Sequence, residues 1–298
     1  MDLQATIPMS TLFETVKILH LEPTDVCQAA CPLCARETDP TFDRSAQHWL
    51  SVADIKRILP EKVIYQLDKM FMCGNYGDPA AGRKTLEIFN YFRSVNSSIT
   101  LGMNTNGGLQ NTNWWTDLAK QFNRPTDYTV FSIDGLADTN HLYRKNVVWD
   151  KVMSNSAAYI RAGGNAHWDM LVYKHNEHQV DECEQLAKHM GFKWFRAKIS
   201  KRPLADSLER PLIWTNPVSK NGPIECMAEK EQSIYISAKG QIYPCCWLGY
   251  NVNYTINNFI DIKASWATDA PNPVCKATCS GTENSFTKQW QKNTELVK

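Results

Sequence analysis

Residues 22–34, EPTDVCQAACPLC, carry the strongest structural signal of this chain, because they place three cysteines in one short loop. Cys27, Cys31 and Cys34 follow the strand-like run 16–21 with the spacing Cys-x3-Cys-x2-Cys. Thiolates are the usual ligands of iron–sulfur clusters, so three of them can hold three irons of a [4Fe–4S] cube. The fourth iron would lack a protein ligand and could bind a substrate or cofactor, as the open position of a catalytic zinc site does.

A structural zinc loop is the alternative interpretation of these cysteines. Zinc takes four ligands, commonly four cysteines or three cysteines and a histidine. His20 or His48 could complete such a set. The triplet alone leaves both interpretations open, and the rest of the chain favours the cluster.

Length and composition describe an ordinary globular protein. The 298 residues are 43% hydrophobic and 21% charged, which is enough for one large domain, or one domain with an appendage. The 32 Lys and Arg nearly balance the 31 Asp and Glu, for a net charge of +1. A net charge this close to zero does not favour binding to nucleic acid or to an anionic membrane. A small molecule or a protein is a better candidate for the substrate.

The N-terminus and the cysteine content indicate a compartment. The first residues, MDLQA, lack the basic region and apolar core of a signal peptide, and no apolar run approaches the roughly 18 residues of a membrane span. Ten cysteines in a chain that lacks a secretion signal point to metal ligands more than to disulfides. An exposed cluster also needs a reducing environment, so we expect a cytoplasmic protein.

Strand-like and helix-like segments alternate from residue 16 to about residue 200. The predicted strands are 16–21, 67–72, 99–103, 128–133, 168–173 and 194–199. The predicted helices are 52–59 with Ser51 as cap, 84–95, 114–122 with Asn113 as cap, 148–162, and a segment from Asn176 to Gly191. Six βα units with short connections imply a parallel sheet. Six units are too few for the closed eight-stranded barrel, so we expect an α/β partial (β/α)6 barrel over residues 1–200, with its site at the C-terminal strand ends.

The character of the chain changes after residue 200. Residues 201–222 contain three prolines with little periodicity and are predicted to form a connector. Residues 223–281 hold five cysteines among strand-like fragments and are predicted to form a small module that is held together by a metal site. In the polar tail 282–298, Phe286 and Trp290 lie one helical turn apart, so this tail could be a docked helix.

Four cysteines of the C-terminal region can meet at one metal site. They are Cys226, Cys245, Cys275 and Cys279. Residues 233–245 have the pattern of a β-hairpin with its turn at Lys239-Gly240, which brings the first two cysteines together. Four thiolates complete a [4Fe–4S] cluster with no open iron, and they would serve a zinc ion equally well. Cys246 is an alternative ligand to its neighbour Cys245.

The cysteine spacing of residues 27–34 resembles the signature of the radical S-adenosylmethionine (SAM) enzymes, in which SAM occupies the open iron through its amino and carboxyl groups. The turns after the next strands are similar to those of the family as well. Residues 73–79, CGNYGDP, stand where the family has a glycine-rich Glu-Pro motif that receives the SAM amino group. Residues 104–108, NTNGG, resemble its Thr-Asn-Gly turn, and residues 131–135, FSIDG, resemble its Ser-Ile-Asp-Gly segment.

This resemblance implies which residues hold the cofactors. Cys27, Cys31 and Cys34 would hold the SAM-binding cluster, and no catalytic side chain is assigned. The implied SAM-binding residues are Leu33, Gly74, Asn75, Gly77, Asp78, Asn106, Ser132 and Arg144. Three positions depart from the family pattern. Leu33 replaces an aromatic residue and Gln28 an asparagine, while Asp78 is one methylene shorter than the usual Glu, so backbone carbonyls could take over its contact.

The spacing from Cys226 through Gly240 to Cys245 resembles the opening of the SPASM and twitch extensions, which carry auxiliary clusters in many radical SAM enzymes. A full SPASM module has more cysteines, so the match is to the shorter twitch type with one auxiliary [4Fe–4S] cluster. The resemblance covers about residues 16–281.

The resemblance implies an oxidoreductase that cleaves SAM reductively to a 5′-deoxyadenosyl radical and abstracts a substrate hydrogen. An external donor such as flavodoxin or ferredoxin would supply the electron. We expect the oxidative modification of a small molecule, because only about fifteen residues precede the first predicted strand, too few for a peptide-binding domain. The alternatives are a radical SAM maturase of peptides or proteins and, in another class, a non-catalytic iron–sulfur or zinc scaffold.

Overall fold

The computed structural model describes residues 13–200, 202, 204–205, 207–212 and 222–280, and the backbone of residues 294–295. The helix predicted within residues 282–298 therefore lies outside the described residues. Only residues 294–295 of this tail are described, and they form a short strand. Most of the predicted connector 201–222 also lies outside the described residues.

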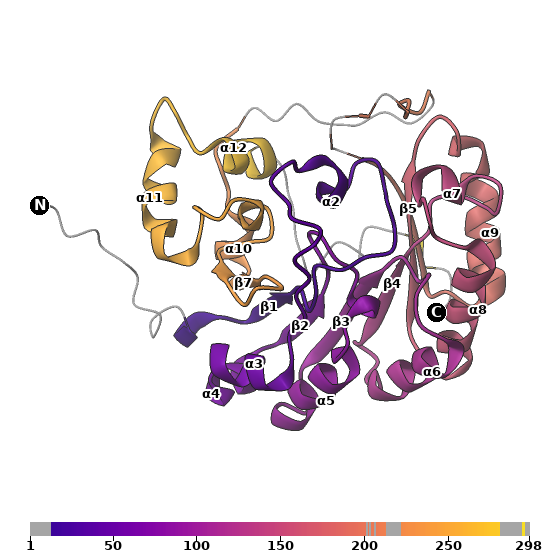
Figure 1. Cartoon of the computed structure of the whole chain (residues 1–298), viewed down its shortest axis with the longest axis horizontal. Coiled ribbons are helices and arrows are strands. Elements are labelled where there is room, and N and C mark those ends of the chain that lie inside the picture. Colours follow the sequence, from indigo (N-terminus) through magenta and orange to yellow (C-terminus); the bar gives the residue numbers. More distant parts are fainter. Residues whose placement is uncertain are drawn as a thin grey trace, which may run out of the picture.

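A mostly parallel sheet forms the centre of the described part of the chain (Figure 1). Its strands are β1 Ile18–Leu21, β2 Lys69–Met72, β3 Thr100–Thr105, β4 Tyr128–Ser132, β5 Ala166–Val172, β6 Trp194–Ile199, β7 Ser233–Ile236, β8 Ile242–Tyr243 and β9 Thr294–Glu295. Their order is β8-β7-β1-β2-β3-β4-β5-β6-β9, and β1 to β6 are parallel neighbours. All six predicted strands are confirmed. The sheet does not close on itself, so the partial barrel is confirmed as well.

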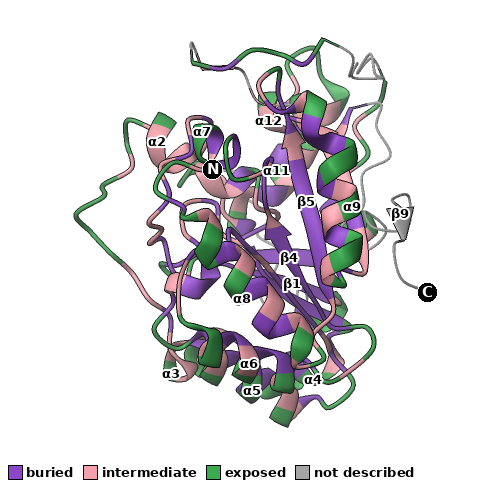
Figure 2. Cartoon of the chain, turned by 90° about the vertical axis from the view of Figure 1, so that its right-hand side faces the viewer, coloured by how far each residue is buried: buried purple, intermediate pink, exposed green. Residues whose placement is uncertain are grey.

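Helices cover one face of this sheet, and Figure 2 shows their exposed sides turned away from the buried strands. They are α3 Val52–Ile58, α4 Glu61–Gln66, α5 Thr85–Val95, α6 Thr112–Gln121, α8 Trp149–Arg161 and α9 Val180–Met190. The other helices with described side chains are α2 Ala35–Thr38, α7 Asn140–Tyr143, α10 Met227–Lys230, α11 Phe259–Ala264 and α12 Pro273–Cys279. Ser51 caps α3 in a complete capping box with Asp54, as the sequence predicts.

Two predicted helix starts differ from the structure. Asn113 does not cap α6; Asn111 does, with its side-chain oxygen 3.0 Å from the backbone nitrogen of Trp114. An asparagine two residues earlier can make the same cap, and the earlier start seats Trp115 fully inside the core. The helix predicted from Asn176 begins instead with a 3-10 turn, Glu177–Gln179, and α9 then ends at Gly191 with a φ of +88°, as expected.

The two faces of the sheet differ in polarity. Alternate strand residues, such as Leu19, Met70, Leu101 and Trp168, are fully buried against the helices in the main core. The residues between them lie on the opposite, inner face, which includes His20, Lys69, Asn104, His167 and Asp169. The inner face is therefore suited to polar ligands, and the core lies on the helical side.

The predicted hairpin of residues 233–245 is confirmed as the antiparallel pair β7–β8. In addition, β7 pairs in parallel with β1, so the hairpin extends the main sheet. All four residues of β7 are buried, and they cover an edge of β1 that would otherwise expose unpaired backbone groups. Figure 1 shows the orange and yellow segment from β7 to α12 beside β1 and the indigo loop that follows it.

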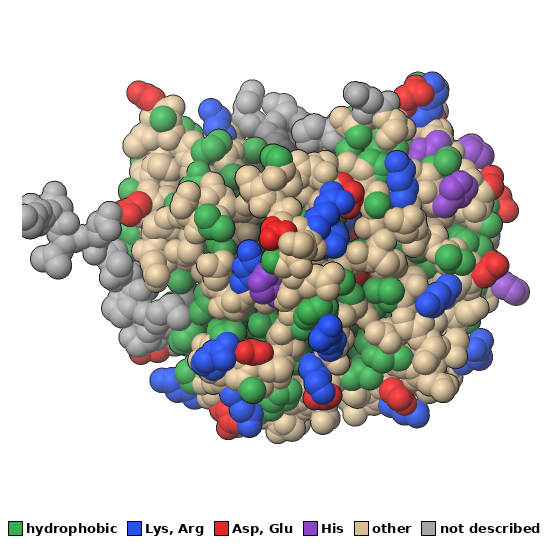
Figure 3. Space-filling view, viewed as in Figure 1, with side chains coloured by type: hydrophobic (Ala, Val, Ile, Leu, Met, Phe, Trp, Pro, Cys, Tyr) green, Lys and Arg blue, Asp and Glu red, His purple; other side chains and the backbone are tan. Residues whose placement is uncertain are grey.

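Charges of both signs are intermixed on the face of the molecule shown in Figure 3, in keeping with the net charge of +1. A helix long and apolar enough to cross a membrane does not occur within the described ranges.

His20 makes the stability of the fold depend on pH. Its ring stacks on Phe71, its Nε2 lies 2.6 Å from the Cys73 carbonyl oxygen, and its buried Nδ1 has no partner. Burial lowers the pKa of His20 to about 4. Because the unfolded chain takes up a proton near pH 6.5 and the folded chain does so only near pH 4, stability falls as the pH decreases through this window.

We expect His20→Gln, which keeps a donor for the carbonyl but does not titrate, to remove about 3 kcal/mol of this acid sensitivity. Urea unfolding of the metal-free protein at about pH 7.5 and about pH 4 measures how much the free energy of unfolding changes with pH. An unchanged difference between the wild type and the variant at the two pH values would refute this role of His20.

Candidate cluster and cofactor site

The three cysteines of the N-terminal motif lie in the loop directly after β1, at the carboxyl end of the sheet. The Cys34 backbone nitrogen donates to the Cys31 carbonyl oxygen at 2.9 Å, and α2 begins one residue later. Cys31 is buried, while Cys27 and Cys34 are partly exposed, and all three thiols are free. The loop thus presents three reduced thiols within eight residues at the edge where parallel sheets place their sites.

Hydrogen-bond donors face two of these sulfur atoms. The Cys27 Sγ lies 3.4 Å from the Ala29 backbone nitrogen and 3.6 Å from Nδ2 of Asn106. The Cys31 Sγ lies 3.8 Å from Nη1 of Arg144. Burial raises the pKa of the Cys31 thiol, and the Arg144 guanidinium opposes this shift. Donors directed at sulfur stabilise a thiolate or a cluster ligand, so the surroundings of the loop fit the proposed iron ligands.

Gln28, one of the departures from the family pattern, links the cysteine loop to the turn after β3. Its Nε2 donates to Oδ1 of Asn106 at 2.8 Å, and Nδ2 of Asn106 lies 3.4 Å from its Oε1. Asn106 therefore contacts both Gln28 and the Cys27 sulfur, and its predicted place beside the cluster loop agrees with this geometry. Its contact with SAM stays a prediction.

The turn after β2 packs directly on the backbone of the cysteine loop. A Cβ atom at Gly77 would lie 1.9 Å from the Thr24 carbonyl oxygen, and one at Gly74 would lie 1.9 Å from the Gly77 carbonyl oxygen. The Asp78 backbone nitrogen donates to the Val26 carbonyl oxygen at 2.9 Å. Glycine is needed at both positions because any side chain would collide with main-chain atoms.

The Asp78 carboxylate is buried and holds two turns together. It accepts hydrogen bonds from the Ala80 backbone nitrogen at 2.9 Å, the Thr105 hydroxyl at 2.8 Å and the Asn106 backbone nitrogen at 2.7 Å. Both oxygens thus serve the turns after β2 and β3. Burial raises the pKa of Asp78, and these donors oppose the shift. Its predicted contact with the SAM amino group remains untested, while its role in shaping the site is evident.

Arg144 and Ser132 belong to the β4 part of the site. Arg144 Nε lies 2.6 Å from Oδ2 of Asp134, whose Oδ1 accepts a hydrogen bond from the Leu171 backbone nitrogen. The pair fixes the guanidinium beside Cys31. Ser132 lies opposite Asp169 in the sheet register, on the inner face.

The remaining predicted cofactor residues have other surroundings. Leu33 is buried in the main core, and its carbonyl oxygen accepts a hydrogen bond from Arg202. Asn75 donates from Nδ2 to the Cys246 carbonyl oxygen at 2.7 Å, so it reaches the C-terminal region. Its place at the strand ends is as expected, but its side chain is directed at the hairpin segment.

The two histidines considered for a zinc site make contacts elsewhere. His20 lies within β1, under the cysteine loop, with its Nε2 at the Cys73 carbonyl. His48 Nδ1 lies 2.6 Å from Oδ2 of Asp25. No group of three or more His, Cys, Asp or Glu side chains is arranged around a single ion in the described part of the chain.

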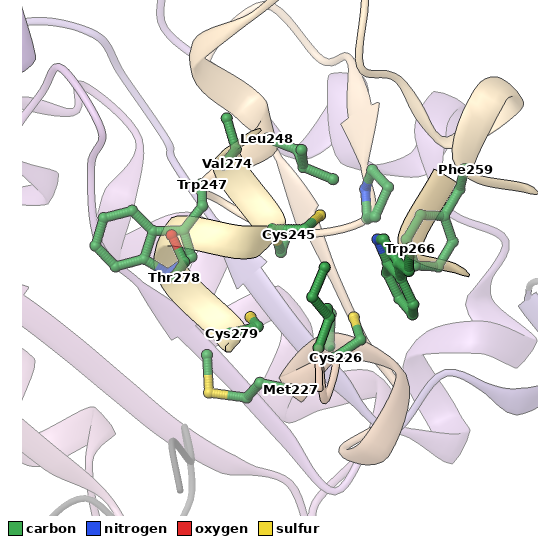
Figure 4. A pocket seen from close by; sticks show the side chains of 14 residues that line it. Cys226, Met227, Cys245, Trp247, Leu248, Phe259, Trp266, Val274, Thr278 and Cys279 are labelled. Carbon is green, nitrogen blue, oxygen red and sulfur yellow. The ribbon is translucent and has the colours of Figure 1, made fainter. Parts of the chain in front are cut away.

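The four C-terminal cysteines line one pocket (Figure 4). Cys226 is the N-cap residue of α10, Cys245 follows β8, and Cys275 and Cys279 lie one turn apart on α12. Apolar side chains form much of the remaining wall, including Leu248, Phe259, Trp266 and Val274. Figure 4 shows Cys226, Cys245 and Cys279 around the same cavity. The four thiols come from three segments, and thiolates are the ligands of iron–sulfur clusters and of structural zinc, although their present arrangement would not hold a single metal ion.

The comparisons with known proteins agree with this site. The family model of the radical SAM superfamily matches residues 21–189, which is more than half of the chain. The chain belongs to the radical SAM superfamily. The match runs from the last residue of β1 into α9, so it includes the three-cysteine loop and each of the turns described above.

Solved structures of radical SAM enzymes share the fold. Streptococcus suis SuiB bound to S-adenosylmethionine superposes with a TM-score of 0.61 at 14% identity, over 86% of this chain and 66% of SuiB. SuiB bound to its precursor peptide SuiA has a TM-score of 0.59 at 17% identity, over 88% of this chain and 66% of that one. Polyhistidine-tagged anSMEcpe with bound AdoMet has a TM-score of 0.60 at 15% identity, over 86% of this chain and 78% of that one.

The chain thus spans just under two thirds of the length of SuiB. At these identities the similarity establishes the fold alone. A search of curated proteins gave no match. Membership of the radical SAM superfamily itself implies an enzyme that uses SAM and a [4Fe–4S] cluster.

The roles of two residues of this radical SAM site, Glu22 and Asp134, are not evident from the sequence motifs. Glu22 is buried, and its Oε1 accepts hydrogen bonds from the backbone nitrogens of Tyr76 and Gly77, at 2.7 and 3.0 Å. Its Oε2 accepts the hydroxyl of Tyr235 in β7. A carboxylate directly after a buried strand is the signal that could have drawn attention to Glu22. Asp134 orients Arg144, a role that the quoted motif alone does not indicate.

Proposed function

We propose that this chain is a radical SAM oxidoreductase that cleaves SAM reductively and abstracts a hydrogen atom from a substrate. The observation that carries the proposal is the position of the three free thiols at the carboxyl end of β1. Asn106 and Arg144, from the turns after β3 and β4, approach two of the sulfur atoms there. The superfamily membership of residues 21–189 supports the same assignment.

The residues of the chain have separate parts in this reaction. Cys27, Cys31 and Cys34 would hold the cluster, and the backbone of Gly74 to Gly77 would lie close to SAM. Arg144, with a guanidinium suited to a carboxylate, would face its methionine end. When bound, the cluster and SAM together supply a 5′-deoxyadenosyl radical that removes the substrate hydrogen. The electron comes from an external one-electron donor of the flavodoxin or ferredoxin class.

We further propose an auxiliary [4Fe–4S] cluster in the C-terminal pocket, held by Cys226, Cys245, Cys275 and Cys279. The hydrophobic core around this pocket is small, with Leu248, Ile256, Phe259, Ile262 and Cys275 as its buried members. A core of this size provides little stabilisation, so a metal site would supply much of the folding free energy of the region. A small hydrophobic core that needs a metal site, together with four thiols around one pocket, is what we expect of a twitch-type module.

The first proposed substrate is a small polar molecule bound on the inner face. On the inner face of β5 and β6, Asp169 lies 2.6 Å from both Arg196 Nε and Lys198 Nζ, which places fixed charges on that face. A peptide is the second candidate, and the observation that favours it is the similarity to SuiB, whose structure contains a precursor peptide. A substrate of either class should increase the rate of 5′-deoxyadenosine formation, so the two classes can be compared in one assay.

Iron content after anaerobic reconstitution tests the two-cluster proposal. We expect about eight irons per wild-type chain, since each cube holds four. Cys226→Ala combined with Cys279→Ala should leave about four irons and preserve SAM cleavage when SAM is supplied with dithionite. The matched control is Cys183→Ala, which removes a fully buried thiol from α9 and should leave all eight.

Two results would contradict the auxiliary cluster. One is zinc in place of iron in the C-terminal pocket, measured by elemental analysis of the purified protein. The other is an unchanged iron content in the double variant. Neither result would contradict the three-cysteine site, which is tested separately by the iron that it binds.

A further inference from the structure

Arg202 connects the two regions that are proposed to hold clusters. Its Nη1 donates to the carbonyl oxygen of Leu33, which lies between Cys31 and Cys34. Its Nη2 lies 3.3 Å from the hydroxyl of Tyr250. Tyr250 ends the 3-10 turn Leu248–Tyr250, which follows Cys245 and Cys246. A single guanidinium thus contacts the three-cysteine loop and the segment next to the C-terminal pocket.

The surrounding segment holds Arg202 in this position. Its backbone nitrogen donates to the Ser200 hydroxyl at 3.3 Å, and Arg210 Nη2 donates to its carbonyl oxygen at 3.1 Å. Arg210 Nη1 donates to the carbonyl oxygen of Ser200. Arg210 is exposed and Arg202 is partly buried, so the two arginines share a segment but differ in their distance from solvent.

The charge of Arg202 is not paired with a carboxylate of the described residues. Among the ion pairs between described residues, none includes Arg202, whereas Arg144 on the other side of the loop is paired with Asp134. Within the described residues, its guanidinium contacts two neutral oxygens, those of Leu33 and Tyr250. A partly buried, unpaired positive charge at the cysteine loop acts on any charge that changes there, because screening by solvent is reduced.

We propose that Arg202 is a positioning residue that raises the reduction potential of the cluster held by Cys27, Cys31 and Cys34. This inference rests on the proposed function. Reduction adds one electron from the external donor to the cluster and no other bond changes, so the negative charge at the loop grows by one. The Arg202 charge stabilises the reduced state more than the oxidised one. Net charge and hydrogen bonds near the cluster are general determinants of its potential.

The test is a dithionite titration of the reconstituted full chain, followed by electron paramagnetic resonance. Of the signals from reduced clusters, the one to follow is the signal that changes when SAM is added. That signal belongs to the cluster with the open iron, because SAM binds there. We expect Arg202→Gln to shift the reduction equilibrium about tenfold toward the oxidised state, which corresponds to about 59 mV for one electron. Arg202→Lys, which keeps the charge, should stay close to the wild type.

Two control variants separate charge from architecture. Arg210→Gln disturbs the same segment without a contact to Leu33, and Tyr250→Phe removes only the hydroxyl next to Arg202. Both should leave the potential near that of the wild type. If Arg202→Gln fails to load iron, Arg202→Met removes the same charge and replaces it in the titration. Loss of iron from both neutral variants but not from Arg202→Lys would overturn the inference, because the charge would then be needed for cluster assembly.

The outcomes distinguish this inference from the proposed function. An unchanged potential in an iron-loaded Arg202→Gln protein overturns the inference while the enzyme assignment stands. So does an equal shift in Arg202→Lys or Arg210→Gln, because the charge would then not be the cause. Absence of any SAM-responsive signal from the wild type instead overturns the proposed function.

Discussion

Cys31→Ala is expected to abolish SAM cleavage and to lower the iron content from about eight to about four per chain. Cys31 is the buried member of the triplet, and its sulfur atom faces Arg144 at 3.8 Å. A cube left with two protein ligands at this loop loses the bond to Cys31, because Cys27 and Cys34 are already used. Iron analysis and chromatography of 5′-deoxyadenosine, both after anaerobic reconstitution, measure the two effects.

Cys183→Ala is the matched control for this variant as well, since it removes a thiol from the core without touching the loop. It should keep the iron content and the 5′-deoxyadenosine yield of the wild type. The assignment of Cys31 fails if its alanine variant still forms 5′-deoxyadenosine at the wild-type rate. Loss of all iron from Cys31→Ala would contradict two independent clusters.

Gly77→Ala is expected to have the second-largest effect. Its Cβ would lie 1.9 Å from the Thr24 carbonyl oxygen, so the turn after β2 and the strand end that precedes Cys27 must move apart. The shift would also disturb the hydrogen bonds of Glu22 with the Tyr76 and Gly77 nitrogens. We expect a loss of about 3 kcal/mol in the free energy of unfolding and a strong decrease in iron loading at the first site.

Gly163→Ala provides the comparison, because a Cβ at Gly163 meets no atom within 4 Å although its φ is +91°. Only the left-handed backbone is strained there, at about 1 kcal/mol. Urea unfolding and iron analysis of the two variants test the prediction. Equal losses in both would show that the close approach of the turn to the cysteine loop does not matter for the site.

The strands and their order could be predicted because the signals are local. Most of the parallel strands are short, largely buried apolar runs, and a turn with glycine follows β2, β3 and β4, so runs such as 128–133 are recognisable without the fold. The three cysteines are equally local, since one loop of eight residues holds them. The cap at Ser51 was predicted for the same reason, whereas two nearby asparagines made the start of α6 ambiguous.

The contacts that connect distant segments could not be predicted. Glu22 meets Tyr235 across 213 residues, Asn75 meets Cys246 across 171, and Arg202 meets Leu33 across 169. No periodicity or spacing encodes such pairs, because they arise only when the sheet brings strand ends together. The pairing of β7 with β1 is of this kind, and it brings the C-terminal hairpin to the edge of the main sheet.

Formation of 5′-deoxyadenosine tests the central claim most directly. The reconstituted wild-type chain, given SAM and dithionite without oxygen, is predicted to release 5′-deoxyadenosine and methionine in equal amounts. Cys27→Ala and Cys34→Ala, treated in the same way, should release neither. An iron-loaded wild type that leaves SAM intact under these conditions would contradict the account.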